Sequence, residues 1–494
     1  MKKQHNPSNF NQALWLFISQ AGTFILIMAS AAILSRYFDK PEYGTYKQVM
    51  WVYTTLYAVF AAGLPGVFSY FIPRLNHRQG KTLVNKLTYL LFFLGAAFSL
   101  TLYFGSSIIA HVLNNPELDT GLRYFALVPV FTLPTMGVEG IYVALRKTKY
   151  LAFYHIISRL FNLICVVTPV LLVGANYKIA LIGWTLAAFL IFLMALWMKN
   201  RPYIKIQPEH ITNMYKMVFN YSIPLMGAGI VGILLQFANQ FFISRYYGTV
   251  VFAEFSNGFI SLPFVGMVAG SVKGVLTPLF SRANYEGNIQ DILSTYKNAA
   301  LRVVNILFPI LVFCLFFAKD IMVFLYGSQY EVSKSYFQIA IIRDFWEILP
   351  YLAILLAFGK TKVNFYMNLV AATVVWIADA VIVYYHLPPV YIAVASSTSC
   401  VLMLSAIYLY INNILRIKLI KPIIKHLLIV TLHSSLILFA VHFFSNTVFH
   451  DLKCYECLIV SGIVFYILLI ATGLIIKINY SESFFYLFKK DNKH

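Results

Sequence analysis

The chain has 494 residues, of which 60% are hydrophobic and 11% are charged. Soluble domains are about 45–50% apolar and about 25% charged, so the composition excludes a water-soluble fold and predicts a protein whose solvent is lipid. The formal net charge of +20 does not indicate nucleic-acid binding, because the basic residues lie in short loops between apolar segments and not on one soluble face.

Apolar segments long enough to cross a bilayer recur along the whole chain. A spanning helix needs about 20 mainly apolar residues, which predicts an all-α polytopic membrane protein with about fourteen transmembrane helices. The predicted spans lie near residues 12–35, 45–72, 86–110, 120–145, 151–174, 178–198, 219–243, 251–280, 298–327, 333–358, 364–385, 389–411, 424–445 and 456–476. The longest connection, roughly 199–218, could form a surface helix, and the aromatic and basic tail from Ser481 to His494 suits a membrane surface.

Basic residues gather in alternate connections between these spans. By this assignment one side of the membrane carries about 22 Lys and Arg residues and the other about 7, and the richer side is the cytoplasmic one. This bias predicts a multi-pass membrane protein with both termini in the cytoplasm. An even number of spans follows, in agreement with fourteen.

A short motif occurs twice at one constant offset. Ser35, Arg36 and Tyr37 end the first predicted span, and Ser244, Arg245 and Tyr246 end the seventh. Chance similarity between apolar helices predicts apolar matches and not the same polar triplet, so we infer an internal duplication. Each repeat has six helices, and an even number returns the chain to the same side of the membrane. The second half therefore begins in the same orientation as the first, and the two are parallel repeats. We divide the chain into six-helix bundles at 1–200 and 201–415, followed at 416–494 by two additional helices and a cytoplasmic tail.

The opening of the chain resembles that of Wzx-type polysaccharide and O-antigen flippases, which belong to the multidrug/oligosaccharidyl-lipid/polysaccharide (MOP) exporter superfamily. The resemblance lies in Ser35-Arg36-Tyr37-Phe38, then Pro41-Glu42-Tyr43-Gly44-Thr45-Tyr46, then Gly63-Leu64-Pro65-Gly66 and Phe71-Ile72-Pro73-Arg74. It implies two six-helix bundles that form a V around a central cavity.

The same resemblance implies a function and a set of partners. The substrate would be an oligosaccharide on a polyprenyl diphosphate carrier, turned across the inner membrane by alternating access for lipopolysaccharide O-antigen, capsule or exopolysaccharide synthesis. Membrane lipid, a polysaccharide polymerase and further assembly proteins are the implied partners. The resemblance implies no cofactor, and transport could be coupled to H⁺ or Na⁺.

Cationic side chains at bilayer depth are the candidates for binding a diphosphate head group. A charge in the membrane is costly and should face protein or water. We favour Arg159, Lys273 and Arg343, each about two turns or more from a predicted span end. Arg343 has an alternative role, because Asp344 and Glu347 are close enough in sequence for a local ion pair. Arg159 and Lys273 have no such neighbour, although cross-helix pairing remains an alternative for both.

Acidic side chains within spans are candidates for ion coupling. Asp379 lies in an apolar segment with no adjacent base, and Glu139 lies in the fourth predicted span. A carboxylate in the membrane can bind a proton or a sodium ion, or it can pair with a base from another helix. We expect no metal site, because the histidines lack ligand spacing.

Several other functions remain open. A multidrug exporter of the same superfamily would favour an acidic cavity, and a lipid II flippase would carry an arginine-rich first helix, whereas residues 6–35 contain no formal charge. A membrane glycosyltransferase or polymerase is a further alternative, but the outer loops are short and we expect no enzyme. The chain has no Walker A sequence for direct ATP coupling.

Overall fold

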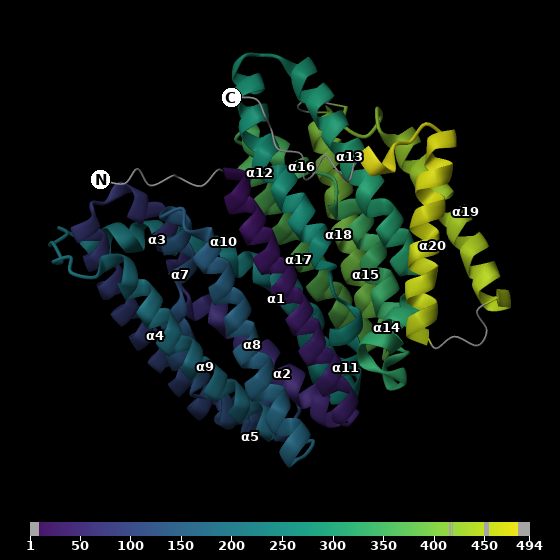
Figure 1. The fold of residues 1–494 in the computed structure, drawn as a ribbon. Coiled ribbons are helices and arrows are strands. Elements are labelled where there is room, and N and C mark those ends of the chain that lie inside the picture. The colour runs from purple at the N-terminus through teal and green to yellow at the C-terminus, as the bar shows by residue number, and fades with distance from the viewer. Residues whose placement is uncertain (1–8, 414–415, 417, 449–453, 483–494) are drawn as a thin grey trace. The chain divides into compact units, whose positions relative to one another are not determined.

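The computed structural model describes residues 9–413, 416, 418–448 and 454–482, and every regular element within these residues is a helix (Figure 1). Eleven helices in this part of the chain are long and apolar enough to cross a membrane, or twelve when one bent pair is counted as a span. The polytopic all-α fold is therefore confirmed. The chain forms two compact units, Met1–Ala253 and Glu254–His494.

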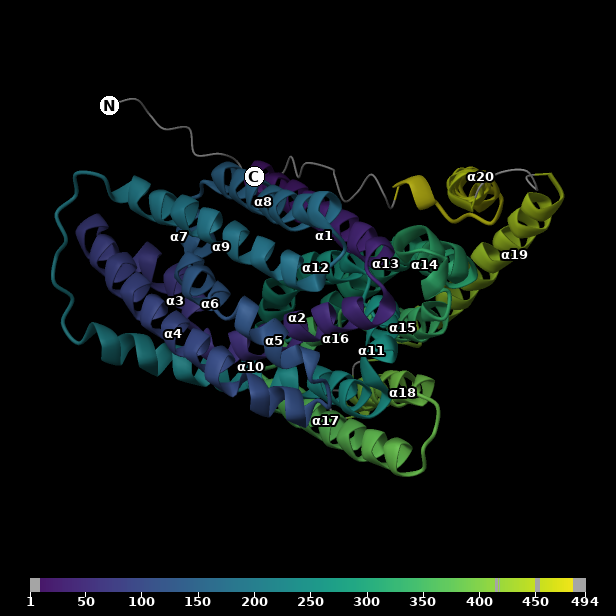
Figure 2. The ribbon, with the colours of Figure 1, turned by 90° about the horizontal axis from the view of Figure 1, so that it is seen from below.

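The first unit contains ten helices that begin and end within its described residues, and α11 (Gly248–Gly258) crosses into the second unit. The helices are α1 (Asn9–Tyr37), α2 (Lys40–Phe60), α3 (Leu64–Phe71), α4 (His77–Val112), α5 (Glu117–Phe125), α6 (Val128–Thr132), α7 (Val138–Ala144), α8 (Thr148–Val173), α9 (Tyr177–Asn200) and α10 (Met214–Phe242). Short 3₁₀-helices η1 (Ile72–Arg74), η2 (Leu133–Thr135) and η3 (Arg201–Tyr203) and the π-helix η4 (Ile243–Tyr247) join some of them. Figure 2 shows α1, α8 and α9 side by side, and α8 packs against both of the others.

Helix α4 shows why these helices require lipid. One face is buried in protein, through residues that include Leu83, Leu87 and Leu91. The opposite face exposes large apolar side chains at helical spacing: Tyr89, Phe93, Leu100, Phe104 and Ile108. An exposed apolar stripe of this length would be unfavourable in water, so its solvent is the hydrocarbon of a membrane.

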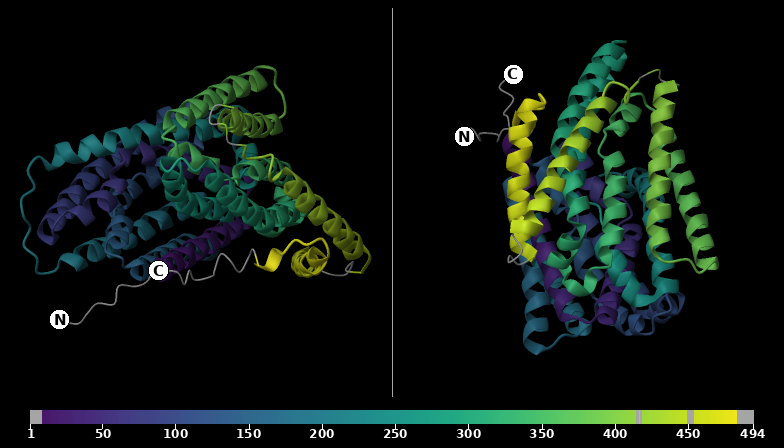
Figure 3. Two further views of the ribbon diagram at one scale, coloured as in Figure 1. Left: turned by 90° about the horizontal axis from the view of Figure 1, so that it is seen from above. Right: turned by 90° about the vertical axis from the view of Figure 1, so that its right-hand side faces the viewer.

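The second unit continues with α12 (Pro263–Tyr285), α13 (Ile289–Phe316), α14 (Ala318–Tyr326), η5 (Ser328–Tyr330), α15 (Ser333–Glu347), α16 (Tyr351–Ala357), α17 (Thr361–Tyr384), α18 (Val390–Asn413), α19 (Ile424–Val448) and α20 (Cys454–Ile475). Helix α12 packs against α13 and α16, and α18 packs against α15 and α17. The last two helices, in yellow tones in Figure 3, pack on this unit through contacts of α19 with α13 and of α20 with α14.

Besides the bent span 45–72, four predicted spans are interrupted where single helices were expected. Residues 120–145 form α5, α6, η2 and α7, and 251–280 form α11 and α12. Residues 298–327 end in the separate α14, and 333–358 divide into α15 and α16. Proline and glycine account for three of these breaks: Pro134 and Gly137 (φ +93°), Pro263 as the first residue of α12, and Pro350 before α16.

The predicted span 45–72 bends at Gly63. Helices α2 and α3, with η1, meet at an angle of 49°. Gly63 has φ +68°, and a Cβ atom there would lie 2.5 Å from the backbone oxygen of Ser222 in α10. Glycine is required at this bend both for its left-handed backbone and for the close approach of α10.

The connection near 199–218 is not a surface helix, so that expectation is wrong. After η3 the backbone is irregular until α10 begins at Met214. Pro208 favours an extended conformation in the residue before it. The segment is fixed to the start of α4 instead. Lys81 Nζ donates to the backbone oxygen of Ile206 at 2.6 Å, and Thr82 Oγ1 donates to the backbone oxygen of Glu209 at 2.6 Å.

Several predictions about the whole chain stay predictions. The two predicted spans beyond the twelve candidates correspond to α10 and to the α15–α16 pair, so the total of fourteen is not established. The parallel repeat, the V around a central cavity and the domain boundaries at 200 and 415 likewise stay predictions. Most of the tail from Ser481 lies outside the described residues.

Candidate functional site

Arg159 lies near the middle of a spanning helix in the first unit. It is the twelfth residue of α8 (Thr148–Val173), about 16 Å along the axis from the start of the helix. Its side chain is half-buried, and among the described residues it makes no ion pair. Arg159 thus lies well away from both ends of its helix, and the cross-helix ion pair left open for it is not formed with any described residue; its role in binding stays a prediction.

The groups around Arg159 are mainly tyrosine hydroxyls. Arg159 lies close enough to Tyr53 and Tyr57 of α2, and to Tyr154 of its own helix, to interact with them electrostatically. The Tyr53 hydroxyl donates to Thr132 Oγ1 at 2.8 Å, and the Tyr53 and Tyr57 rings lie 5.4 Å apart between centroids. The side chains thus combine one cation with phenol groups that can donate hydrogen bonds and stack on a sugar.

Glu139 lies in the same neighbourhood but not against Arg159. It is in the first turn of α7 and is exposed. His155 of α8 interacts electrostatically with both Glu139 and Arg159, and its Nδ1 forms a 2.8 Å hydrogen bond with Ser19 Oγ of α1. The structure thus brings Glu139 and Arg159 of the predicted site residues together around His155.

Arg343, in the second unit, is paired with acids on its own helix. Its Nη2 atom lies 3.1 Å from Asp344 Oδ1, and its Nε atom lies 3.7 Å from Glu347 Oε1. Arg343 Nη2 also donates to Ser261 Oγ at 2.5 Å. Because α15 ends at Glu347, Arg343 is one turn from the helix end and not the expected two or more. The ion pair left open as an alternative for this arginine is therefore formed.

Lys273 lies near the middle of α12, with ten residues of the helix before it and twelve after it. Its side chain is half-buried and makes no ion pair with any residue that the structure describes. Gly270 and Gly274 flank it, and a Cβ atom at either would have no atom within 4 Å. The lysine thus lies on a loosely packed part of its helix.

Asp379 is a buried acidic group of the second unit. It lies in α17 about 8 Å from the C-terminal end, and its side chain is fully buried. Neither carboxylate oxygen has a hydrogen-bond partner among the described residues. An ionised carboxylate is very costly in such surroundings unless a proton or cation accompanies it.

Lys199 is a buried cation that sequence reasoning missed. We expected it in a cytoplasmic loop, but its side chain is 1% exposed. Its Nζ atom donates to the Pro134 oxygen at 2.6 Å and to Thr88 Oγ1 at 3.2 Å, and it lies 5.1 Å from the centre of the Phe68 ring. No signal in the sequence separates it from Arg201, because both end the same apolar segment. Among the described residues, no group of three His, Cys, Asp or Glu side chains could hold a metal ion.

Comparison with known proteins gives one family match. The model of a family described as polysaccharide biosynthesis protein matches residues 33–335. No curated protein matches the chain in sequence.

Solved structures with a similar fold are membrane transporters. The lipid II flippase MurJ in an inward closed conformation superposes with a TM-score of 0.67 at 16% identity, over 94% of this chain and 99% of that chain. An outward-facing multidrug resistance MATE family transporter of the MOP superfamily has a TM-score of 0.55 at 12% identity, over 84% and 97% of the two chains. A MOP superfamily transporter from Pyrococcus furiosus, described as having a binding pocket of reverse polarity, has a TM-score of 0.57 at 12% identity, over 83% and 96%. These likenesses establish the fold.

Proposed function

Because the chain belongs to the polysaccharide biosynthesis protein family and has the fold of MOP superfamily transporters, we propose that it is a flippase for an oligosaccharide linked to polyprenyl diphosphate. It moves the sugar head group across the bacterial inner membrane for surface polysaccharide synthesis, such as O-antigen of lipopolysaccharide. Its polar groups serve to bind the transported substrate and not to catalyse a reaction. Neither the family nor the fold by itself selects this substrate over lipid II or a drug.

The observation that carries the proposal is the placement of Arg159. A guanidinium at membrane depth needs an anionic or polar partner, and the described residues supply tyrosine hydroxyls but no carboxylate within ion-pair distance. A diphosphate group would supply the missing negative charge through bidentate hydrogen bonds. Tyr53, Tyr57 and Tyr154 would face the sugars next to it.

The other predicted residues complete the proposed mechanism. In the second unit, Lys273 is the candidate cation for the substrate path, acting as a point charge, whereas Arg343 positions α15 through its ion pairs. Asp379, and secondarily Glu139, would couple transport to a gradient of H⁺ or Na⁺ by binding the ion. In the cell, a polysaccharide polymerase and other assembly proteins would take up the product on the outer face.

The test compares Arg159→Ala, Arg159→Lys and Lys273→Ala in cells that lack the native protein. We expect Arg159→Ala to reduce surface polysaccharide about tenfold or more, because a hydrogen bond to a charged group contributes about 1.5–3 kcal/mol. Arg159→Lys keeps the charge but loses the paired N–H donors of the guanidinium, so we expect partial activity. The measurement is surface polysaccharide normalised to membrane protein level.

The control is Arg282→Ala, which removes an exposed arginine that pairs with Glu286 at 2.8 Å. It should leave polysaccharide unchanged. Normal polysaccharide in both Arg159→Ala and Lys273→Ala, at equal protein level, would contradict the proposed site.

A multidrug exporter is the second candidate, and the buried Asp379 favours it. A carboxylate without a partner among the described residues can attract an organic cation as well as a proton. Cells that carry the protein would then accumulate less ethidium than cells with the Asp379→Asn variant. Equal ethidium levels, with altered polysaccharide, would support the flippase.

A further inference from the structure

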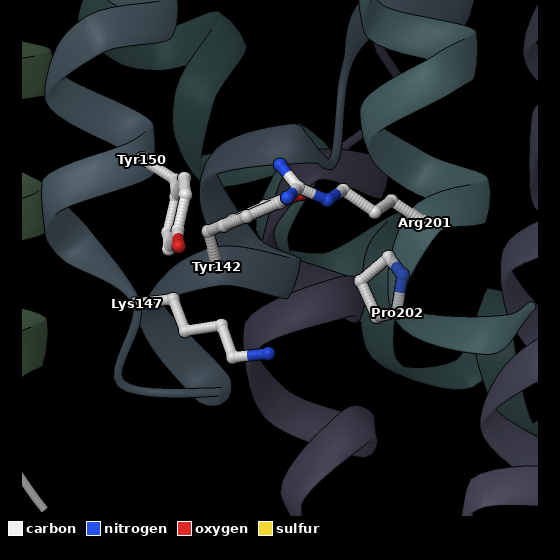
Figure 4. A pocket seen from close by; sticks show the side chains of 5 residues that line it. All are labelled: Tyr142, Lys147, Tyr150, Arg201 and Pro202. Carbon is white, nitrogen blue, oxygen red and sulfur yellow. The ribbon is translucent and has the colours of Figure 1, made fainter.

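A separate cationic pocket lies at the ends of three helices of the first unit. Its cavity has a volume of 290 Å³ and is lined by Tyr142, Lys147, Tyr150, Arg201 and Pro202. The lining comes from the end of α7, the turn that follows it, the start of α8 and the end of α9 with η3 (Figure 4). The pocket shares no lining residue with the site around Arg159.

The two cations approach the pocket from opposite sides. Figure 4 shows the Lys147 ammonium and the Arg201 guanidinium both directed toward its middle. Neither side chain makes an ion pair with any described residue. The positive charge of the pocket is therefore not neutralised within this part of the protein.

The backbone that carries Lys147 is fixed by hydrogen bonds, and the Arg201 guanidinium lies beside two aromatic rings. The turn after α7 is fixed by two backbone hydrogen bonds. The backbone N–H of Lys147 donates to the backbone oxygen of Tyr142 (2.8 Å), and that of Arg146 donates to the backbone oxygen of Val143 (3.0 Å), with Arg146 at φ +56°. The Arg201 guanidinium carbon lies 5.3 Å from the Tyr150 ring centre and 4.9 Å from that of Trp197. Both distances lie within cation–π range, so the two rings favour this position of the guanidinium and leave its N–H donors for a ligand.

The shape and donors of the pocket fit a phosphate group. Arginine recognises phosphate oxygens in pairs, and lysine adds a point charge. The hydroxyl of Tyr142 donates to the Met198 backbone oxygen at 3.1 Å, whereas Tyr150, which also lines the pocket, is 46% exposed. A phosphate monoester or diester would receive hydrogen bonds from both cations and a tyrosine.

The location indicates that the phosphate is carried by a lipid. Trp197 and Tyr150 are large and exposed, and they lie at helix ends where aromatic side chains mark the membrane–water interface. Anionic head groups are concentrated there, and basic pockets between helix ends bind them. A soluble phosphate has no such enrichment.

We propose that the pocket formed by Lys147, Tyr150 and Arg201 binds the phosphate head group of an anionic phospholipid of the surrounding leaflet. This site is independent of the transported substrate, because its residues are not those of the proposed transport path. It would fix the ends of α7, α8 and α9 relative to the membrane surface.

The experiment counts lipids bound to the full-length protein by native mass spectrometry. Phosphatidylglycerol is titrated against phosphatidylcholine with the same acyl chains, for the unaltered protein and for Lys147→Ala combined with Arg201→Ala. We expect the unaltered protein to retain one phosphatidylglycerol in preference to phosphatidylcholine, and the double variant to bind it about tenfold more weakly.

The matched control combines Lys149→Ala with Lys216→Ala, which removes the same charge from basic residues that do not line the pocket. It should keep the preferred lipid. An equal loss in this control would overturn the pocket as the binding site, since charge alone would then explain the effect. The binding of phosphatidylglycerol by Arg201→Lys should lie between that of the double variant and that of the control, because lysine keeps the charge but lacks the guanidinium group.

A second arm distinguishes a lipid from a soluble anion. Glycerol 3-phosphate and inorganic phosphate are added at concentrations equal to that of the lipid. We expect neither to displace phosphatidylglycerol. Displacement by either, or binding of glycerol 3-phosphate as tight as that of the lipid, would overturn the assignment to a membrane lipid.

Discussion

Single buried charges in this protein have surroundings that differ from one position to the next. Arg343 has two carboxylates, Lys199 has a carbonyl and a hydroxyl, and Asp379 has no partner among the described residues. The sequence predicted the ion pairs of Arg343, because its partners Asp344 and Glu347 are one and four residues away. It could not identify the Lys199 contacts, since Pro134 is 65 residues distant.

Asp379→Asn tests whether the buried carboxylate carries a coupling ion. The amide has nearly the same shape and no charge, so we expect the variant to fold as well as the unaltered protein. We expect it to lose the dependence of transport on the ion gradient. The measurement is lipid-linked sugar translocation in vesicles with and without imposed H⁺ or Na⁺ gradients. Full gradient dependence in the variant would exclude Asp379 as the coupling residue.

Lys199→Met tests a structural role for the buried ammonium. Methionine retains most of the apolar stem but cannot donate to the Pro134 oxygen, which lies in η2, where the chain leaves helical geometry before Gly137. An unsatisfied buried acceptor costs about 1–3 kcal/mol, so we expect a lower Tm in detergent. Lys216→Met, at an exposed position on α10, is the control. A Tm equal to or above that of the unaltered protein would mean that desolvation of the ammonium outweighs its hydrogen bonds.

At the scale of helices, hydropathy located the elements, and backbone chemistry decided where they break. The predicted spans coincide with helical segments throughout the described chain, because about 20 apolar residues are needed to cross the bilayer. The interruptions at Gly137 and at Ile348–Pro350 were missed, since an apolar window does not respond to a change in φ or to a lost N–H group. The bend between α2 and α3 lies at Gly63, where glycine and proline are close together in the sequence.

Close helix packing gives a prediction for Gly183 of α9. A Cβ atom at this position would lie 2.1 Å from the Cys165 oxygen of α8. Gly183→Ala must therefore separate α8 from α9, and overpacking of this kind costs about 1–3 kcal/mol. Thermal unfolding of the purified protein should show a clear loss of Tm.

The matched control for Gly183→Ala is Gly274→Ala in α12, where a Cβ atom would meet nothing within 4 Å. Alanine is favoured over glycine in a helix by about 1 kcal/mol, so this variant should be as stable as the unaltered protein or more so. Equal Tm changes for the two variants would show that α8 and α9 do not approach as closely as described.

For the whole molecule, composition was sufficient to predict an all-helical membrane protein, and a short motif pointed to its superfamily. The candidate site was predicted less completely. Arg159 was identified from its depth in an apolar segment, but Tyr53 and Tyr57 lie more than 100 positions earlier in the chain and reach it only through packing of α2 near α8. A single sequence contains no signal for that contact.

The orientation inferred from the basic loops can be tested by labelling. In a background without the five native cysteines, we expect Ala175→Cys to react with a membrane-impermeant maleimide added to intact spheroplasts. His210→Cys should react only after the membrane is permeabilised, because it lies in a predicted cytoplasmic connection. Both positions are exposed in the structure. The reverse pattern would contradict cytoplasmic termini.

The attachment of residues 206–209 to α4 has a consequence for motion. The contacts of Ile206 and Glu209 with Lys81 and Thr82 join two stretches of chain that are more than 120 residues apart. Residues 206–209, which lead into α10, are therefore fixed to α4, and displacing them would also move the start of α4. Any rocking of α10 within this unit is therefore coupled to movement of the start of α4.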